Sequence, residues 1–78
     1  MDDVIKKWQT SYGTLTLFYN NKITETNSCI TTWTYDEFLN KCNSKVFCTL
    51  IKHMYGDNAF KEIIKLTQDE INAQEKEV

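Results

Sequence analysis

The sequence contains no arginine and no proline, and it has only two glycines, Gly13 and Gly56. The scarce residues Arg, Pro, Gly and Ala have GC-rich codons, whereas the abundant Lys, Asn and Ile have AT-rich codons. This bias indicates a low-GC genome, such as that of a phage, another virus or an AT-rich bacterium. Arginine is the residue best suited to reading phosphates and bases. Its absence is weak evidence against nucleic-acid recognition, because codon usage alone accounts for it.

The sequence also lacks a segment that could cross a membrane or direct secretion. No run of about 18 apolar residues is present. The start, MDDVIKKWQT, is acidic first and too poor in apolar residues for a signal peptide. Three cysteines are an odd number for a secreted disulfide scaffold. We therefore expect no membrane association and a cytoplasmic location, in the host cell if the source is viral.

Length and charge limit the function classes further. The 78 residues are expected to form a single domain over 1–78, with about 74–78 as a frayed tail. Nine lysines face eleven acids, which gives a net charge of −2. The lysines are interleaved with acids, so the basic stripe of a nucleic-acid binder is missing. A domain this small buries only about 60% of its unfolded surface, so self-association would add useful buried area.

The first residues have the pattern of a short amphipathic helix over 2–9. Val4, Ile5 and Trp8 would share one face of that helix. Asp3 and Lys7 form one of two acid-before-base pairs four residues apart, which support a helix by about 0.2–0.5 kcal/mol each. The sequence therefore predicts a short N-terminal helix.

Residues 13–34 predict a three-stranded antiparallel meander. TLTLFY alternates between two faces, and Asn20-Asn21 and Asn27-Ser28 suit two-residue hairpin turns. This register places Phe18 opposite Ile23. One face then carries Leu15, Leu17, Tyr19, Cys29 and Trp33. The other carries Phe18, Ile23 and Ile30 among threonines.

The second half of the chain predicts two or three helices. Thr34 followed by Glu37 is a capping-box pattern. The segment 45–55 has a broad apolar stripe, and Gly56 follows it as a C-terminal cap. That stripe comprises Val46, Phe47, Leu50, Ile51, Met54 and Tyr55. A last helix is expected over about 58–75, antiparallel to 45–55. Residues 35–55 fit either one bent helix or two, and the fold class is α+β with these helices packed on one face of the sheet.

Four residues have side chains that could bind a metal ion. Cys29, Cys42, Cys48 and His53 have a spacing loosely similar to that of the CCCH zinc finger, which prefers three residues before its histidine. On one continuous helix, however, Cys42 and Cys48 would point about 240° apart and could not share a tetrahedral site. We expect no metal ion and no cofactor.

Catalytic patterns are equally weak. Cys48 has Lys45 and Lys52 as helical neighbours, which would favour a thiolate. His53 projects about 140° away on the same helix, so it cannot act as the base for that thiol. The sequence predicts no catalytic residue, and we expect that the protein is not an enzyme.

The second face of the sheet therefore becomes the main functional question. Either the first helix covers it through Val4, Ile5 and Trp8, or it is open to a partner or to a second copy of the chain. Contiguous exposed apolar patches often mark interaction sites. The predicted partner-binding residues are Phe18, Ile23, Ile30 and Trp8.

The first hypothesis is a small non-enzymatic protein-binding module. Such a module fits an inhibitor or accessory protein of a phage or low-GC bacterium that acts on a host or defence protein, with homodimerisation as a further option. One alternative is a nucleic-acid-binding regulator that uses Lys41, Lys45, Lys52, Lys61 and Lys65. The other is an antitoxin or immunity-type protein.

Overall fold

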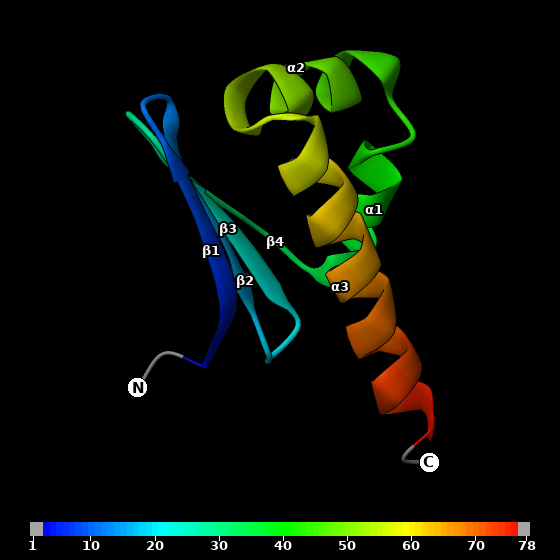
Figure 1. The fold of residues 1–78 in the computed structure, drawn as a ribbon. Helices are drawn as coiled ribbons and strands as arrows, with labels where there is room; N and C mark the ends of the chain where they lie inside the picture. Colours follow the sequence, from blue (N-terminus) through cyan, green and yellow to red (C-terminus); the bar gives the residue numbers. More distant parts are fainter. Residues whose placement is uncertain (1–2, 77–78) are drawn as a thin grey trace.

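The computed structural model describes residues 3–76, which form one antiparallel sheet and three helices. All three helices lie on the same side of the sheet (Figure 1). The elements are β1 (Val4–Thr10), β2 (Gly13–Phe18), β3 (Lys22–Thr26), β4 (Ile30–Trp33), α1 (Tyr35–Lys41), α2 (Lys45–Tyr55) and α3 (Asp57–Lys76). The four strands are ordered β1-β2-β3-β4. The α+β class and the placement of the helices on one face are confirmed, and the sheet has one strand more than predicted.

The additional strand, β1, replaces the predicted N-terminal helix, so that prediction is wrong. Residues Val4–Thr10 pair antiparallel with β2, with Trp8 opposite Leu15. An isolated helix of about eight residues is marginal, and the expected ion pairs add only tenths of a kcal/mol. Pairing with β2 satisfies the backbone groups on one side of β1, and β-branched and aromatic residues suit a strand. Asp2 of the predicted helix lies outside the described residues.

The β2–β3 hairpin has a three-residue loop in place of the predicted two-residue turn. Leu17 pairs with Ile23, and Phe18 pairs with Lys22. Asn21 ends the loop with a φ of 63°, in the left-handed region that Asn tolerates. Its side-chain oxygen also accepts a hydrogen bond of 3.0 Å from the backbone N–H of Tyr35. The loop is therefore held by the first residue of α1, which the turn residues alone do not reveal.

This shift of one residue turns β3 over relative to the prediction. Ile23 is fully buried on the face that the helices cover, not on the face of Phe18. The β3–β4 loop is also one residue longer than predicted, with Thr26 paired to Ile30. The two errors cancel at β4, where Trp33 faces the helices as expected. Tyr19 and Cys29, predicted on the covered face, are instead exposed in the two loops.

The helix boundaries follow the capping residues in the sequence. Thr34 forms the predicted capping box with Glu37. The chain then breaks after Cys42, and Ser44 accepts a hydrogen bond from the N–H of Phe47, so residues 35–55 form two helices. Gly56, with a φ of 98°, ends α2 as predicted.

The helix α3 starts immediately after Gly56 and continues through Lys76. In Figure 1, α2 lies across the N-terminal end of α3 and is not antiparallel to it. A single residue between the helices is shorter than the links that reverse a helix pair, which explains why this prediction is wrong. Residues 74–76 of the predicted tail are helical, and Glu77 and Val78 lie outside the described residues. No helix among the described residues is long and apolar enough to span a membrane.

The core lies between the sheet and the helices. Its buried apolar residues are Trp8, Leu15, Leu17, Ile23, Tyr35, Phe38, Ile51, Tyr55 and Ile63. Around Trp33, three aromatic rings meet edge to face, with centroid distances of 5.5 Å to Phe38 and 5.8 Å to Phe47. This cluster joins β4, α1 and α2, so the position of α2 is fixed by side chains from two other elements.

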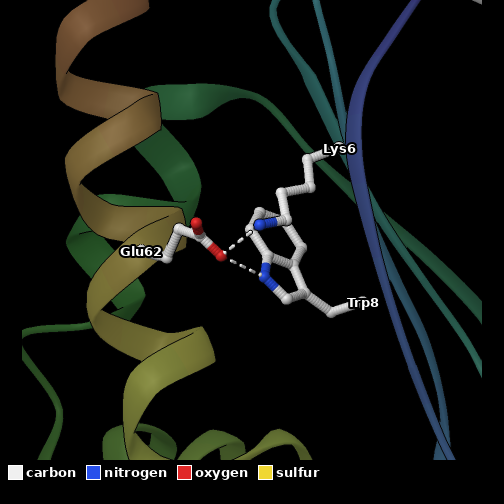
Figure 2. A network of polar contacts seen from close by, with 3 residues as sticks. All are labelled: Lys6, Trp8 and Glu62. Atoms are coloured by element: carbon white, nitrogen blue, oxygen red, sulfur yellow. Dashed lines mark hydrogen bonds and ion pairs between the residues drawn. The ribbon is translucent and has the colours of Figure 1, made fainter.

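A polar contact joins β1 to α3 at the edge of this core. One carboxylate oxygen of Glu62 accepts from Lys6 Nζ at 2.7 Å and from Trp8 Nε1 at 2.8 Å (Figure 2). These two donors lower the pKa of the Glu62 carboxyl, the Lys6 contact contributing most. The contact explains why Trp8 faces the helices and why its indole N–H is satisfied although the ring is buried.

The C-terminal end of α2 rests on the sheet at Gly13. The Tyr55 hydroxyl donates to a Glu25 carboxylate oxygen at 3.1 Å. Burial and the neighbouring Glu25 both raise the pKa of Tyr55. A Cβ at Gly13 would lie 2.6 Å from the carbonyl oxygen of Thr26 and 3.2 Å from the Tyr55 hydroxyl. Only glycine therefore allows the strand and the helix to approach this closely.

Candidate protein-binding surfaces

The helix α2 carries apolar side chains on two sides, and only one side belongs to the core. The inner side consists of Phe47, Ile51, Met54 and Tyr55, which all belong to the core or pack against it. At 3.6 residues per turn, Leu50 lies about 100° and Val46 about 140° around the helix from Ile51. These two side chains are 51% and 79% exposed, respectively.

A shallow apolar hollow lies along this outward side of α2. Lys45, Val46, Thr49, Leu50 and His53 line it. Tyr12, in the turn between β1 and β2, extends it, because its ring centroid is 5.3 Å from that of His53. We call these six residues the α2 surface. It combines two exposed aliphatic side chains with an exposed tyrosine, and tyrosine is enriched among the residues that anchor protein interfaces.

The α2 surface is built on a fixed support. The Thr10 hydroxyl donates to the carbonyl oxygen of Met54 at 3.0 Å and accepts from the Tyr12 N–H at 3.2 Å. The Thr10 hydroxyl therefore closes the β1–β2 turn and also joins that turn to the C-terminal end of α2. Together with the inner packing of α2, this holds the aromatic and aliphatic parts of the surface in one relative position.

The open sheet face is the second candidate surface. No helix of the described chain covers it (Figure 1). Strand register assigns to it Val4, Lys7, Gln9, Thr14, Thr16, Phe18, Lys22, Thr24, Thr26, Ile30 and Thr32. Ile30 is 73% exposed, but Phe18 is half-buried and Lys22 Nζ lies 4.4 Å from the centre of its ring. Threonines and other polar residues occupy most of this face, so its apolar area is broken up.

The predicted partner-binding residues divide between the two sides of the sheet. Phe18 and Ile30 lie on the open sheet face. Ile23 is 0% exposed and Trp8 is 9% exposed, both on the side of the helices. The register shift and the replacement of the first helix by β1 account for these corrections. Ile23 and Trp8 therefore cannot contact a partner without unfolding.

The cysteines and His53 do not form one group, although Cys42 and Cys48 are neighbours. Cys29 is exposed in the β3–β4 loop, whereas the Cys48 thiol donates to the carbonyl oxygen of Cys42. Burial raises the pKa of the Cys42 thiol to about 11, and the nearby Cys48 adds to this effect. Among residues 3–76, no three His, Cys, Asp or Glu side chains lie close enough to hold a metal ion.

Sequence reasoning missed the α2 surface although a signal for it was present. The apolar stripe of α2, from Val46 to Tyr55, spans about 180° of the helix. One face packed on a sheet buries a narrower arc, close to about 100°. The stripe is wider than the arc that the sheet can bury, so the residues at its edge, Val46 and Leu50, remain exposed. Comparisons with protein-family models, curated proteins and solved structures found no match, so functional inference rests on these surfaces.

Proposed function

We propose that the protein is a non-enzymatic protein-binding module and that it contacts its partner through the α2 surface. The observation that carries this proposal is the side-by-side exposure of Val46 and Leu50 on a helix whose other side already fills the core. Exposing such side chains gains nothing for folding, whereas a partner that covers them gains about 25 cal/mol per Å² of apolar area. Tyr12 adds an aromatic anchor at the end of the same surface.

The separation of the reactive side chains supports a binding role. The Cys48 thiol points to the Cys42 carbonyl, and the His53 ring lies against Tyr12 on another side of α2. A thiol nucleophile requires a base within hydrogen-bond reach. The candidate hollow is lined mainly by aliphatic and methyl groups, which suit contact with another protein better than chemistry on a substrate.

The composition suggests the biological setting. The codon bias fits a phage or a low-GC bacterium, where small single-domain proteins often act by blocking or assisting a larger one. We propose that the partner is a host or defence protein and that the encounter takes place in the cytoplasm. Inhibition would then follow from covering a surface of that partner.

Affinity capture from the source or host lysate tests this proposal. The bait is the full chain, compared with the double variant Val46→Ser/Leu50→Ser. A control variant, Phe18→Ser/Ile30→Ser, makes the corresponding apolar-to-polar changes on the open sheet face. All three baits are first compared by urea denaturation, so that a loss of binding is not a loss of folding.

We expect a partner that the wild-type chain and the open-face control capture and that the α2 double variant loses. If the open-face control alone loses the partner, binding occurs on the other side of the sheet. If the α2 variant, folded as the wild type, captures every partner unchanged, the α2 surface is not the binding site.

A further inference from the structure

We propose that the α2 surface binds an acidic amphipathic helix of the partner protein. This inference rests on the proposed function and adds the chemistry of the segment that is bound. It follows from two properties of the α2 surface, its charge and its shape.

The α2 surface itself is positively charged, because Lys45 is the one charged residue among its six members. The net charge of the chain is −2, yet α2 contains Lys45 and Lys52 and no acidic residue. Lys52 has a carboxylate neighbour, with its Nζ 3.8 Å from Asp57. Lys45 has no ion pair among residues 3–76. Its ammonium group is therefore available to a carboxylate from outside the chain.

The backbone of α2 adds to this positive potential. Lys45 and Val46 are the first two residues of the helix, where unpaired N–H groups and the macrodipole favour negative charge. The N-cap Ser44 accepts from the N–H of Phe47 over a long 3.4 Å. Acidic side chains of a partner are thus favoured at the end of the α2 surface where Lys45 lies.

The shape of the α2 surface favours a helix as the occupant. Val46 and Leu50 are four residues apart and form an i, i+4 row, a ridge in the helix-packing sense, which borders the shallow hollow together with Lys45. Ridges of this kind pack into the grooves of a second helix. The fitting partner segment carries apolar residues at helical spacing toward the ridge and Asp or Glu along the border that meets Lys45.

A second copy of the chain satisfies these requirements less well. In a two-fold pair the same patch meets itself. Each α2 would bring its lysines and no acidic side chain of its own to the contact, so a contact between two α2 helices pairs like charges. A nucleic acid would satisfy Lys45 but would leave Val46 and Leu50 without an apolar contact.

The test begins with an unbiased display library of 16-residue peptides and the full-length wild-type chain as target. Peptides that bind are counter-selected against Val46→Ser/Leu50→Ser. We expect the peptides that depend on this ridge to be net acidic, with apolar residues three or four positions apart. A dependent set that is neutral or basic, or the absence of any dependent peptide, overturns the inference.

The second arm measures the affinity of the best acidic peptide by fluorescence anisotropy. We expect Lys45→Glu to weaken binding by about tenfold, and a peptide with Lys in place of its acids to bind this variant better than wild type. Lys7→Glu, which makes the same change of charge at an exposed residue of β1, controls for the change in net charge. Equal effects of the two variants would contradict a contact at Lys45.

Two further measurements separate the rival occupants. If sedimentation shows that the wild-type chain is a dimer and that Val46→Ser/Leu50→Ser is a monomer, the occupant of the α2 surface is a second copy of the chain and not an acidic helix. Binding of mixed oligonucleotides that falls steeply with salt and is lost in Lys45→Glu would replace it by nucleic acid. If lysate capture depends on Val46 and Leu50 while the selected peptides are not acidic, this inference fails and the proposed function stands. If capture does not depend on these residues either, both fail.

Discussion

Both sides of α2 carry large aliphatic residues, and these residues have opposite roles in the structure. On the inner side, Ile51 is 1% exposed and packs between the helices and the sheet. On the outer side, its sequence neighbour Leu50 is 51% exposed and forms part of a shallow hollow. Hydrophobicity alone therefore does not decide whether a residue of α2 belongs to the core. The decisive factor is the direction in which Trp33, Phe38 and the sheet hold the helix.

The largest effect on stability is expected for a substitution on the inner side of α2. Ile51→Ala leaves a cavity in the core, which the surrounding side chains cannot fill completely. We expect the free energy of unfolding to fall by about 2–5 kcal/mol, measured by urea denaturation. A fall below about 1 kcal/mol would mean that the inner side is not packed as described.

The close contact at the end of the inner side gives the next largest effect. Gly13→Ala would place a Cβ 2.6 Å from a backbone carbonyl oxygen, at a φ of 155°. We expect a loss of about 2 kcal/mol in the free energy of unfolding. Gly56→Ala is the control, because its φ of 98° is also strained but nothing lies within 4 Å of the new Cβ. If Gly13→Ala loses no more stability than Gly56→Ala, the close approach of Gly13 to the Thr26 carbonyl is contradicted.

A buried polar group in α3 gives a prediction of opposite sign, because removing it should raise the free energy of unfolding. Thr67 is 0% exposed, and its hydroxyl has no hydrogen-bond partner among the described residues. Thr67→Val removes this unsatisfied group without changing the shape, so we expect a gain of about 1 kcal/mol in thermal or urea denaturation. Thr49→Val, on the exposed side of α2, should change stability by less than about 0.5 kcal/mol. A clear loss in Thr67→Val would indicate a hidden partner for the hydroxyl.

The contact of Glu62 with Lys6 and Trp8 makes the stability of the fold depend on pH. The donors Lys6 and Trp8 lower the pKa of Glu62 in the folded state. The stability it adds is therefore present above its unfolded pKa of about 4.3 and is lost as the pH falls through the lower folded value. The urea midpoint of Glu62→Gln should lie below that of wild type at about pH 7, and the difference should shrink at about pH 3. A difference that stays constant over this range would contradict the assignment.

The smallest stability effect is expected on the outer side of α2. Leu50→Ala removes an exposed side chain and keeps a good helix former, so the free energy of unfolding should change by less than about 0.5 kcal/mol. The same variant should weaken partner capture. A stability loss near that of Ile51→Ala would place Leu50 in the core and remove the distinction between the two sides.

Local patterns predicted the elements whose ends are fixed by nearby residues. The capping box of Thr34 and Glu37 and the glycine at 56 place the ends of α1 and α2 correctly. The first strand was missed because its pairing with β2 is not encoded in residues 4–10 alone. Likewise, the loop before β3 depends on the contact between Asn21 and Tyr35, fourteen positions along the chain. Contacts of this kind cannot be derived from local periodicity.

The candidate site was predicted only in part, for the same reason. Phe18 and Ile30 lie on the open sheet face, where the sequence placed them. Ile23 was misplaced because a register shift of one residue moves every side chain of a strand to the other face. Val46 and Leu50 were not separated from the rest of the apolar stripe, because periodicity gives the width of a stripe and not the direction in which the helix faces.

Hydroxyl-radical footprinting of the free chain at low concentration tests the central claim most directly. We predict strong oxidation of Leu50, Val46 and Tyr12 and weak oxidation of Ile51 and Phe47, with the first group protected when the partner is bound. If Leu50 is oxidised as slowly as Ile51 in the free monomer, α2 has no separate outer side, and the binding surface proposed for this protein does not exist.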